Sequence, residues 1–342
     1  MICYRMIIIA SLSLAVNARA QQRPVQSLYM FDPILINPAY AGMQVQLSTT
    51  AIYRNQWVNL DGAPKTLTAS THSSFFKNKM GLGIIFSNDQ IGIHNDASFY
   101  GIYSYKIMLN STSSISFGLQ GGFNNLKSDY NKLNLKNQGD PNLAGVVTKF
   151  NPNIGTGMFY RNKNLYLGIS SPQLIKNKVF DVESSSGSTS LSQQERYYYV
   201  LAGTTLKLSE NVKLFPSTLI RFQDEAPVSF DLNSTFVLYD AVGLGLSYRL
   251  QEGIVGLFEL QVNEKFHVGY AYDFTTSLLN QFSNGSHEIM INYRAKVTKA
   301  QKGLPCPSYY TYGILEPVKV KKKLRFNSDK GHKRKKPNVR KR

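Results

Sequence analysis

Five histidines are the residues of this sequence best suited to acid–base catalysis or metal binding. None stands at the spacing of a metal-binding pair, and His287-Glu288 lacks the second histidine of a zinc-protease helix. No glycine motif that would cradle a phosphate opens a helix. We therefore predict no metal site and no cofactor. The histidines are His72, His94, His267, His287 and His332.

A hydrolase site could still be assembled from residues that lie far apart in the sequence. Ser247, His267 and Asp273 supply the three side-chain types of a serine hydrolase triad. All three, however, occupy the polar positions of segments in which polar and apolar residues alternate. Such residues are expected as the polar wall of a lumen, which favours a protein that is not an enzyme.

The segments that must position these residues alternate with a period of two, as strands do. Tyr and Phe number 21 and 19 in 342 residues, which also favours strands, and the chain is predicted to be all-β. We expect about 14 antiparallel strands. Their ranges are 45–57, 65–75, 79–88, 96–109, 112–127, 151–160, 164–171, 195–208, 211–223, 226–238, 241–251, 253–262, 265–276 and 285–297.

Connection lengths favour a transmembrane outer-membrane β-barrel over residues 45–297. Every second connection is short and polar, whereas residues 129–150, 172–194 and 277–284 form longer loops, and both termini are expected on the periplasmic side. Closure would leave no strand edge unpaired in lipid. A secreted β-sandwich shows the same alternation and is the alternative.

The N-terminus has the order of a secretory signal peptide. Arg5 precedes an apolar run over residues 6–16, and an A-x-A site ends at Ala20. We predict cleavage of residues 1–20 between Ala20 and Gln21, with a buried first helix as the alternative. Cys3 would leave with the signal, so the remaining Cys306 cannot form an intramolecular disulfide.

An irregular, apolar and proline-rich leader follows over residues 21–44. Prolines at positions 24, 33 and 38 oppose a regular helix or a central strand, and so apolar a peptide should be packed away from water, either in the lumen or across the periplasmic mouth. It is a candidate plug or partner segment, and packing for stability alone is the alternative. The residues concerned are Tyr29, Met30, Phe31, Asp32, Pro33, Asn37, Pro38, Ala39, Tyr40 and Gly42.

The C-terminal end carries most of the positive charge. After a periplasmic segment over residues 298–317, residues 318–342 hold 13 Lys or Arg and one acid, a net +12 of the chain's +18. We predict a disordered tail that docks on acidic ring proteins or on lipid headgroups, or is inert. The periplasmic location argues against nucleic acid as a partner. Its basic clusters are Lys321, Lys322, Lys323, Arg325, Lys333, Arg334, Lys335 and Lys336.

Several motifs make the sequence recognisable between residues 27 and 293. They are YMFDP at 29–33, INPAYAG at 36–42, YRNQW at 53–57, DGAPKT at 61–66, GLG at 81–83, NDQIG at 88–92, GYAYD at 269–273 and GSHE at 285–288. With these motifs the chain resembles the PorP/SprF family. Asp32 departs from the pattern, in which Asn is expected at this position.

The resemblance implies an outer-membrane component of the type IX secretion system of Bacteroidetes. Such proteins support secretion or surface attachment of cargo, including gliding adhesins, and work with a periplasmic secretion ring. A porin-like transporter of small solutes, lined by residues such as Asp231, Arg249, Glu259 and Arg294, is the alternative. An outer-rim motif is expected to lie in the aromatic belt and to offer a cargo contact. It comprises Trp57, Asp61, Gly62, Ala63 and Pro64.

Overall fold

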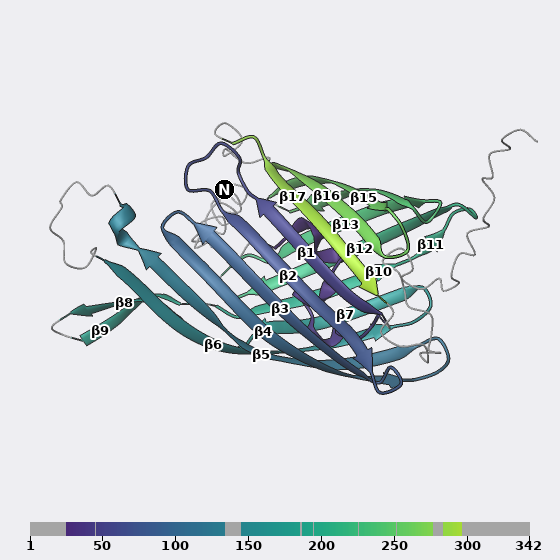
Figure 1. The fold of residues 1–342 in the computed structure, drawn as a ribbon, viewed down its shortest axis with the longest axis horizontal. Helices are drawn as coiled ribbons and strands as arrows, with labels where there is room; N and C mark the ends of the chain where they lie inside the picture. Colours follow the sequence, from purple (N-terminus) through teal and green to yellow (C-terminus); the bar gives the residue numbers. More distant parts are fainter. Residues whose placement is uncertain are drawn as a thin grey trace, which may run out of the picture.

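One large antiparallel sheet dominates the computed structural model (Figure 1), which describes residues 25–44, 46–133, 145–184, 187–193, 195–224, 226–250, 252–275 and 283–295. Its strands are β1 (Leu47–Asn55), β2 (Lys65–Phe75), β3 (Met80–Ile91), β4 (His94–Met108), β5 (Ser114–Asp129), β6 (Val146–Arg161), β7 (Leu165–Gln173), β10 (Tyr197–Thr204), β11 (Leu206–Lys207), β12 (Val212–Gln223), β13 (Ser229–Leu238), β14 (Val242–Arg249), β15 (Gly253–Gln261), β16 (Phe266–Thr275) and β17 (Ser286–Ala295). Two further strands, β8 (Lys178–Ser184) and β9 (Gly187–Gln193), pair with each other in a separate hairpin.

The sheet closes on itself because its first and last strands pair. Leu47 of β1 lies opposite Ala295 of β17, and Asn55 lies opposite His287. β10 and the two-residue β11 both pair with β12, so we count them as one strand of the barrel. In the described part of the chain the closed sheet therefore has 14 long antiparallel strands. The predicted all-β barrel of about 14 strands is confirmed.

The two ends of the barrel differ in their connections, as expected. At the end that we call the turn end, tight turns join β2 to β3, β4 to β5 and β13 to β14. Tyr239 and Asp240 both have φ 53°, as the two central residues of a type I′ hairpin turn do. The opposite end, the loop end, carries residues 56–64, 130–133 and 174–177, and η4 (Tyr130–Lys132) lies there.

Two connections contain more regular structure than the sequence predicted. The loop expected over residues 172–194 holds the β8–β9 hairpin. β6 begins at Val146, five residues before the predicted start at 151, because β5 continues to Asp129 and pairs with it. Serine, lysine and asparagine dilute the alternation in both stretches, so the pattern there is typical of loops.

Alternation separates the two faces of the barrel wall. In β1 the side chains of Ser48, Thr50, Ile52 and Arg54 are buried, and those of Thr49, Ala51 and Tyr53 are exposed. Large apolar residues cover the outside of the sheet, among them Leu119, Leu232 and Leu246. An apolar exterior on a closed sheet is the arrangement that a bilayer requires. No helix within the described ranges is long and apolar enough to cross a membrane.

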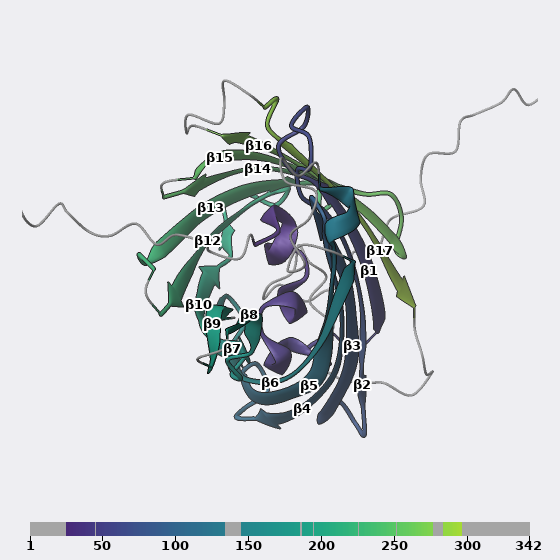
Figure 2. The same cartoon turned by 90° about the vertical axis from the view of Figure 1, so that its left-hand side faces the viewer.

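Residues 25–44, which we call the lumenal segment, run through the inside of the barrel (Figure 2). The segment contains three short 3₁₀ helices, η1 (Ser27–Met30), η2 (Pro33–Leu35) and η3 (Pro38–Tyr40). Proline opens η2 and η3, where its missing N–H is not needed, and the Asn37 side chain accepts from Ala39 N at 2.9 Å. Leu28, Ile34 and Ala39 are fully buried, so the hydrophobic core is built around this segment.

The lumenal segment crosses the barrel from the loop end to the turn end. Val25 contacts Arg54, near the end of β1, whereas Gly42 contacts Lys106, near the end of β4 at the opposite mouth. β1 then starts at the turn end, where β17 finishes at Ala295. Val25 and Ala295 therefore lie at opposite ends of the barrel. The termini, both predicted to be periplasmic, lie outside the described residues.

Candidate functional site

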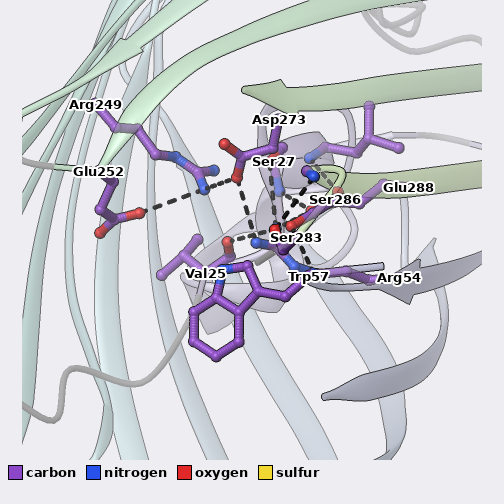
Figure 3. Close-up of polar contacts among 12 residues, drawn as sticks. Val25, Ser27, Arg54, Trp57, Arg249, Glu252, Asp273, Ser283, Ser286 and Glu288 are labelled. Carbon is purple, nitrogen blue, oxygen red and sulfur yellow. Dashed lines mark hydrogen bonds and ion pairs between the residues drawn. The ribbon is translucent and has the colours of Figure 1, made fainter. Parts of the chain in front are cut away.

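At the loop end, Glu288 and Arg54 hold the start of the lumenal segment (Figure 3). The Ser27 N–H donates to Glu288 Oε1 at 2.6 Å, and the Leu28 N–H donates to Oε2 at 3.0 Å. Arg54 forms an ion pair with the same carboxylate and also donates to Val25 O at 3.4 Å. Glu288 thus satisfies two N–H groups that η1 leaves without an internal partner, and Arg54 neutralises its charge.

A belt of ion pairs extends from this anchor around the loop end of the lumen. Arg249 lies 3.6 Å from Asp273 and 3.4 Å from Asp231, and Asp273 lies 3.4 Å from Arg54. Arg221 completes the belt, 3.2 Å from Asp231 and 2.8 Å from Glu252. Asp231 and Arg249, which would line a selectivity filter in the transporter hypothesis, are each paired and almost fully buried.

Glu252 lies in the turn between β14 and β15, outside the membrane-spanning strands. Burial acts to raise the pKa of its carboxyl, but Arg221 and Arg249 outweigh that influence and hold the pKa below its ordinary value. Glu252 is therefore charged at neutral pH and keeps the two arginines in place.

The middle of the lumenal segment is fixed by hydrogen bonds to lumen-facing groups. Asn37 Nδ2 donates to Met158 O at 3.0 Å, and Ser170 Oγ donates to Ile36 O at 2.7 Å. Nearer the loop end, Asn233 Nδ2 donates to the Tyr29 hydroxyl at 2.7 Å. These bonds reach the neighbouring strands β6 and β7 and, elsewhere on the wall, strand β13, so the segment is held at two parts of the wall.

Asp32 is a buried carboxyl on the lumenal segment. The Ser70 hydroxyl donates to it, and His72 Nε2 lies 4.0 Å from Asp32 Oδ1. An asparagine, expected here from the family pattern, would fit the same partners without a charge.

At the turn end, three polar side chains and one glycine of the wall contact the last residues of the lumenal segment. Lys106 Nζ donates to Gly42 O at 2.8 Å, and Ser104 Oγ donates to Ala41 O at 2.6 Å. The Gly42 N–H points to His72 Nδ1 at 3.4 Å. Gly81 gives Ala41 room, since a Cβ there would lie 2.2 Å from the Ala41 oxygen. Groups of the barrel wall thus pack closely against the backbone of the lumenal segment.

All ten residues predicted for the leader lie in the lumen and are buried. Tyr40 shows the packing, because its ring lies edge-on to Phe159 at 5.4 Å and to His72 at 5.7 Å. Burial leaves little of these side chains accessible to a partner protein in this conformation. The predicted partner role therefore requires the segment to move, whereas a plug does not.

The predicted rim motif lies in the loop over residues 56–64 at the loop end. The Trp57 N–H donates to Ser286 Oγ at 3.2 Å (Figure 3), so the motif starts beside the Glu288 anchor. Gly62 O accepts from Gly92 N at 2.9 Å, which ties the loop to the next hairpin. Asp61 is exposed, and a cargo contact at this loop remains a prediction.

The serine hydrolase arrangement is not formed. His267 lies at the turn end of β16 and Asp273 near its loop end, and six residues of strand separate them by about 20 Å. Among the described residues, no three His, Cys, Asp or Glu side chains gather as metal ligands would. The predicted cleavage site at Ala20 and Gln21 and the basic tail lie outside the described residues.

Sequence reasoning missed the two residues that anchor the lumenal segment most strongly. Arg54 and Glu288 occupy lumen-facing positions in β1 and β17 and lie directly opposite each other in the ladder. Both belong to the motifs YRNQW and GSHE. The available signal was that Arg54 and Glu288 carry opposite charges and lie at similar distances from the ends of the first and last strands.

Comparison with protein families gives one match. The sequence profile of the family described as "Type IX secretion system membrane protein PorP/SprF" matches residues 18–293. The matched range contains the whole lumenal segment and all barrel strands except the last two residues of β17. No curated protein sequence matches the chain.

Solved structures similar to this chain are outer-membrane proteins of low sequence identity. The "CymD monoaromatic hydrocarbon channel" is 13% identical with a TM-score of 0.47, covering 82% of this chain and 96% of that one. The outer membrane protein Omp33 of Acinetobacter baumannii is 8% identical with a TM-score of 0.41, covering 74% and 100%. The toluene transporter TodX of Pseudomonas putida is 11% identical with a TM-score of 0.43, covering 83% and 97%.

Proposed function

Because this chain belongs to the PorP/SprF family of type IX secretion system membrane proteins, we propose that it is a non-enzymatic outer-membrane barrel that supports secretion or surface attachment of a protein cargo. In this function the lumenal segment is a plug, and the barrel is a closed scaffold. Its partners are the cargo at the loop end, periplasmic ring proteins at the turn end, and outer-membrane lipid around the wall.

The observation that carries this proposal is the anchoring of the lumenal segment at both mouths of the barrel. Glu288 and Arg54 bind its first residues, and Ser104 and Lys106 bind its last ones. A solute pore needs a continuous aqueous path, and buried apolar residues such as Ile34 occupy that path here. This favours a scaffold over the porin-like alternative.

The lengths of the connections support an orientation with the turn end in the periplasm. Barrels of this kind place short turns in the periplasm and longer loops outside. Ala295 at the turn end would then lead residues 298–342 into the periplasm, where the basic tail could dock on acidic ring proteins or anionic lipid. Truncation after Tyr312 is expected to reduce recovery of ring proteins, and unchanged recovery would mean an inert tail.

A strain that lacks this gene is expected to lose one or a few large proteins from its surface and culture medium. The proteomes of that strain and the wild type provide the measurement, and purified intact protein in planar bilayers provides the matching test of conduction. The proposed function predicts loss of cargo with a closed barrel. Unchanged proteomes together with a steady open current would instead support a solute transporter.

A further inference from the structure

At the loop end of the barrel, strand β6 extends beyond its pairing with the neighbouring strand β7. It pairs with β5 along its whole length, from Val146 opposite Asp129 to Arg161 opposite Ser114. Its ladder with β7, by contrast, covers only Thr156–Arg161 of β6. The outer part of β6 therefore has a strand on one side and, within the described residues, no strand on the other.

The Asn153 side chain forms hydrogen bonds at the point where β6 and β7 separate. Asn153 Oδ1 accepts from Leu174 N at 3.0 Å and from Ile175 N at 3.1 Å, and Asn153 Nδ2 donates to Ile175 O at 3.0 Å. Asn153 is 1% exposed, and Pro152 next to it has no N–H to offer a partner strand. The pairing of β6 with β7 thus ends at a defined point, and residues 146–151 continue beyond it.

The backbone direction of these residues follows from two hydrogen bonds. Gly145 O accepts from Tyr130 N on the β5 side, so alternate residues from 145 onward face β5. Ile154 O accepts from Leu174 N on the opposite side. The even-numbered residues Val146, Thr148 and Phe150 therefore direct their N–H and C=O groups away from β5, into the open edge.

The open edge lies outside the hydrocarbon layer. Unpaired strand groups cannot remain in lipid, and a row of aromatic residues marks where the apolar wall ends. On the outer face the ring of Phe123 lies 6.3 Å from that of Phe99 and 4.8 Å from that of Phe150. Beyond this row Lys127 of β5 faces outward opposite Thr148 of β6, and Val146 is the apolar residue that follows on β6.

We propose that residues 146–151 of β6 receive an extended strand of the exported protein, which adds to the sheet antiparallel or parallel to β6. This inference rests on the proposed function. An open edge supplies main-chain hydrogen bonds, and side chains beside it select the occupant. Val146 is 48% exposed and Phe150 63% exposed, so they favour apolar residues in the added strand.

The length of the open edge and the pairing of the chain's own strands favour a cargo strand as the occupant. They argue against a second copy of the chain and against the chain's own β8 and β9. Six residues of strand span only about 20 Å, too short to bury the roughly 1,600 Å² of a standard interface between two copies of the chain. The chain's own β8 and β9 are paired with each other in a separate sheet. A single extended segment from a protein that is held at other points of the barrel fits this edge.

The test is the variant Thr148→Pro in the full-length protein. Proline removes the N–H that points into the open edge without removing a bond to β5, and the native Pro152 occupies an equivalent position in the same strand. Thr148→Val keeps the N–H and is the matched control. The probe is the purified cargo protein that the strain lacking the gene fails to display. Amide hydrogen exchange over residues 146–151 and retention of this cargo are the readouts.

The wild type and Thr148→Val are expected to show exchange slowed at least about tenfold over residues 146–151 when cargo is added, and Thr148→Pro to retain less cargo. Two results would overturn the inference while the proposed function stands. One is cargo retained by Thr148→Pro without protection of the edge in the wild type. The other is an edge already protected before cargo is added, which would assign it to the β8–β9 hairpin or to a second copy. Failure of the gene deletion to affect any cargo would overturn both.

Discussion

The variant Glu288→Ala is expected to free the loop-end part of the lumenal segment and to lower the free energy of unfolding by about 3 to 5 kcal/mol. The substitution removes the acceptor of the Ser27 and Leu28 N–H groups and leaves Arg54 buried without its closest carboxylate. Bilayer recordings should then show open current where the wild type is closed. Chymotrypsin should gain access first to Tyr29 and Phe31.

Two further variants separate release of the segment from general damage to the barrel. Glu252→Ala is the control, because the Glu252 side chain is 40% exposed and forms ion pairs with Arg221 and Arg249 of the wall. The double variant Arg54→Leu with Glu288→Leu removes both charges but restores no acceptor for the segment. It is expected to regain part of the stability and still to conduct. A closed, protease-resistant double variant would show that Glu288 does not hold the plug.

The variant Gly118→Val is expected to release the opposite, turn-end part of the segment. A Cβ at Gly118 would lie 2.2 Å from Ala39 N and 2.5 Å from Ala39 Cα, so η3 has to leave its position. Overpacking of this kind typically costs about 1 to 3 kcal/mol, which a barrel of paired strands should survive. We expect open current and chymotrypsin cleavage first after Tyr40, which reverses the order expected for Glu288→Ala.

Gly121→Val provides the matched control in the same strand. A Cβ at Gly121 has no heavy atom within 4 Å, and the position faces outward from the lumen. This variant should remain closed and resistant to chymotrypsin. Equal current from the Gly118 and Gly121 variants would attribute conduction to a weakened β5 and not to displacement of the segment.

The strands were predictable from the sequence because their signal is local. A residue and the next but one share a face, so alternation such as that of Leu244, Leu246 and Tyr248 identifies a strand whatever lies beside it. Short polar turns at every second connection identify the two ends in the same way. The same local rule missed the start of β6 at Val146, because that stretch is held by pairing with β5 and not by a strong pattern of its own.

By itself, then, the sequence determined a closed all-β wall, a leader apolar enough to need burial, and the family motifs. Only the tertiary structure decided where the leader lies and what holds it. Arg54 and Glu288 become neighbours only when β1 pairs with β17, and the bond from Ser27 N to Glu288 joins residues 261 positions apart. The leader has no periodicity, so its route from the loop end to the turn end depends on these distant contacts. Local pattern fixes strands, whereas closure of the barrel brings together the groups that form the site.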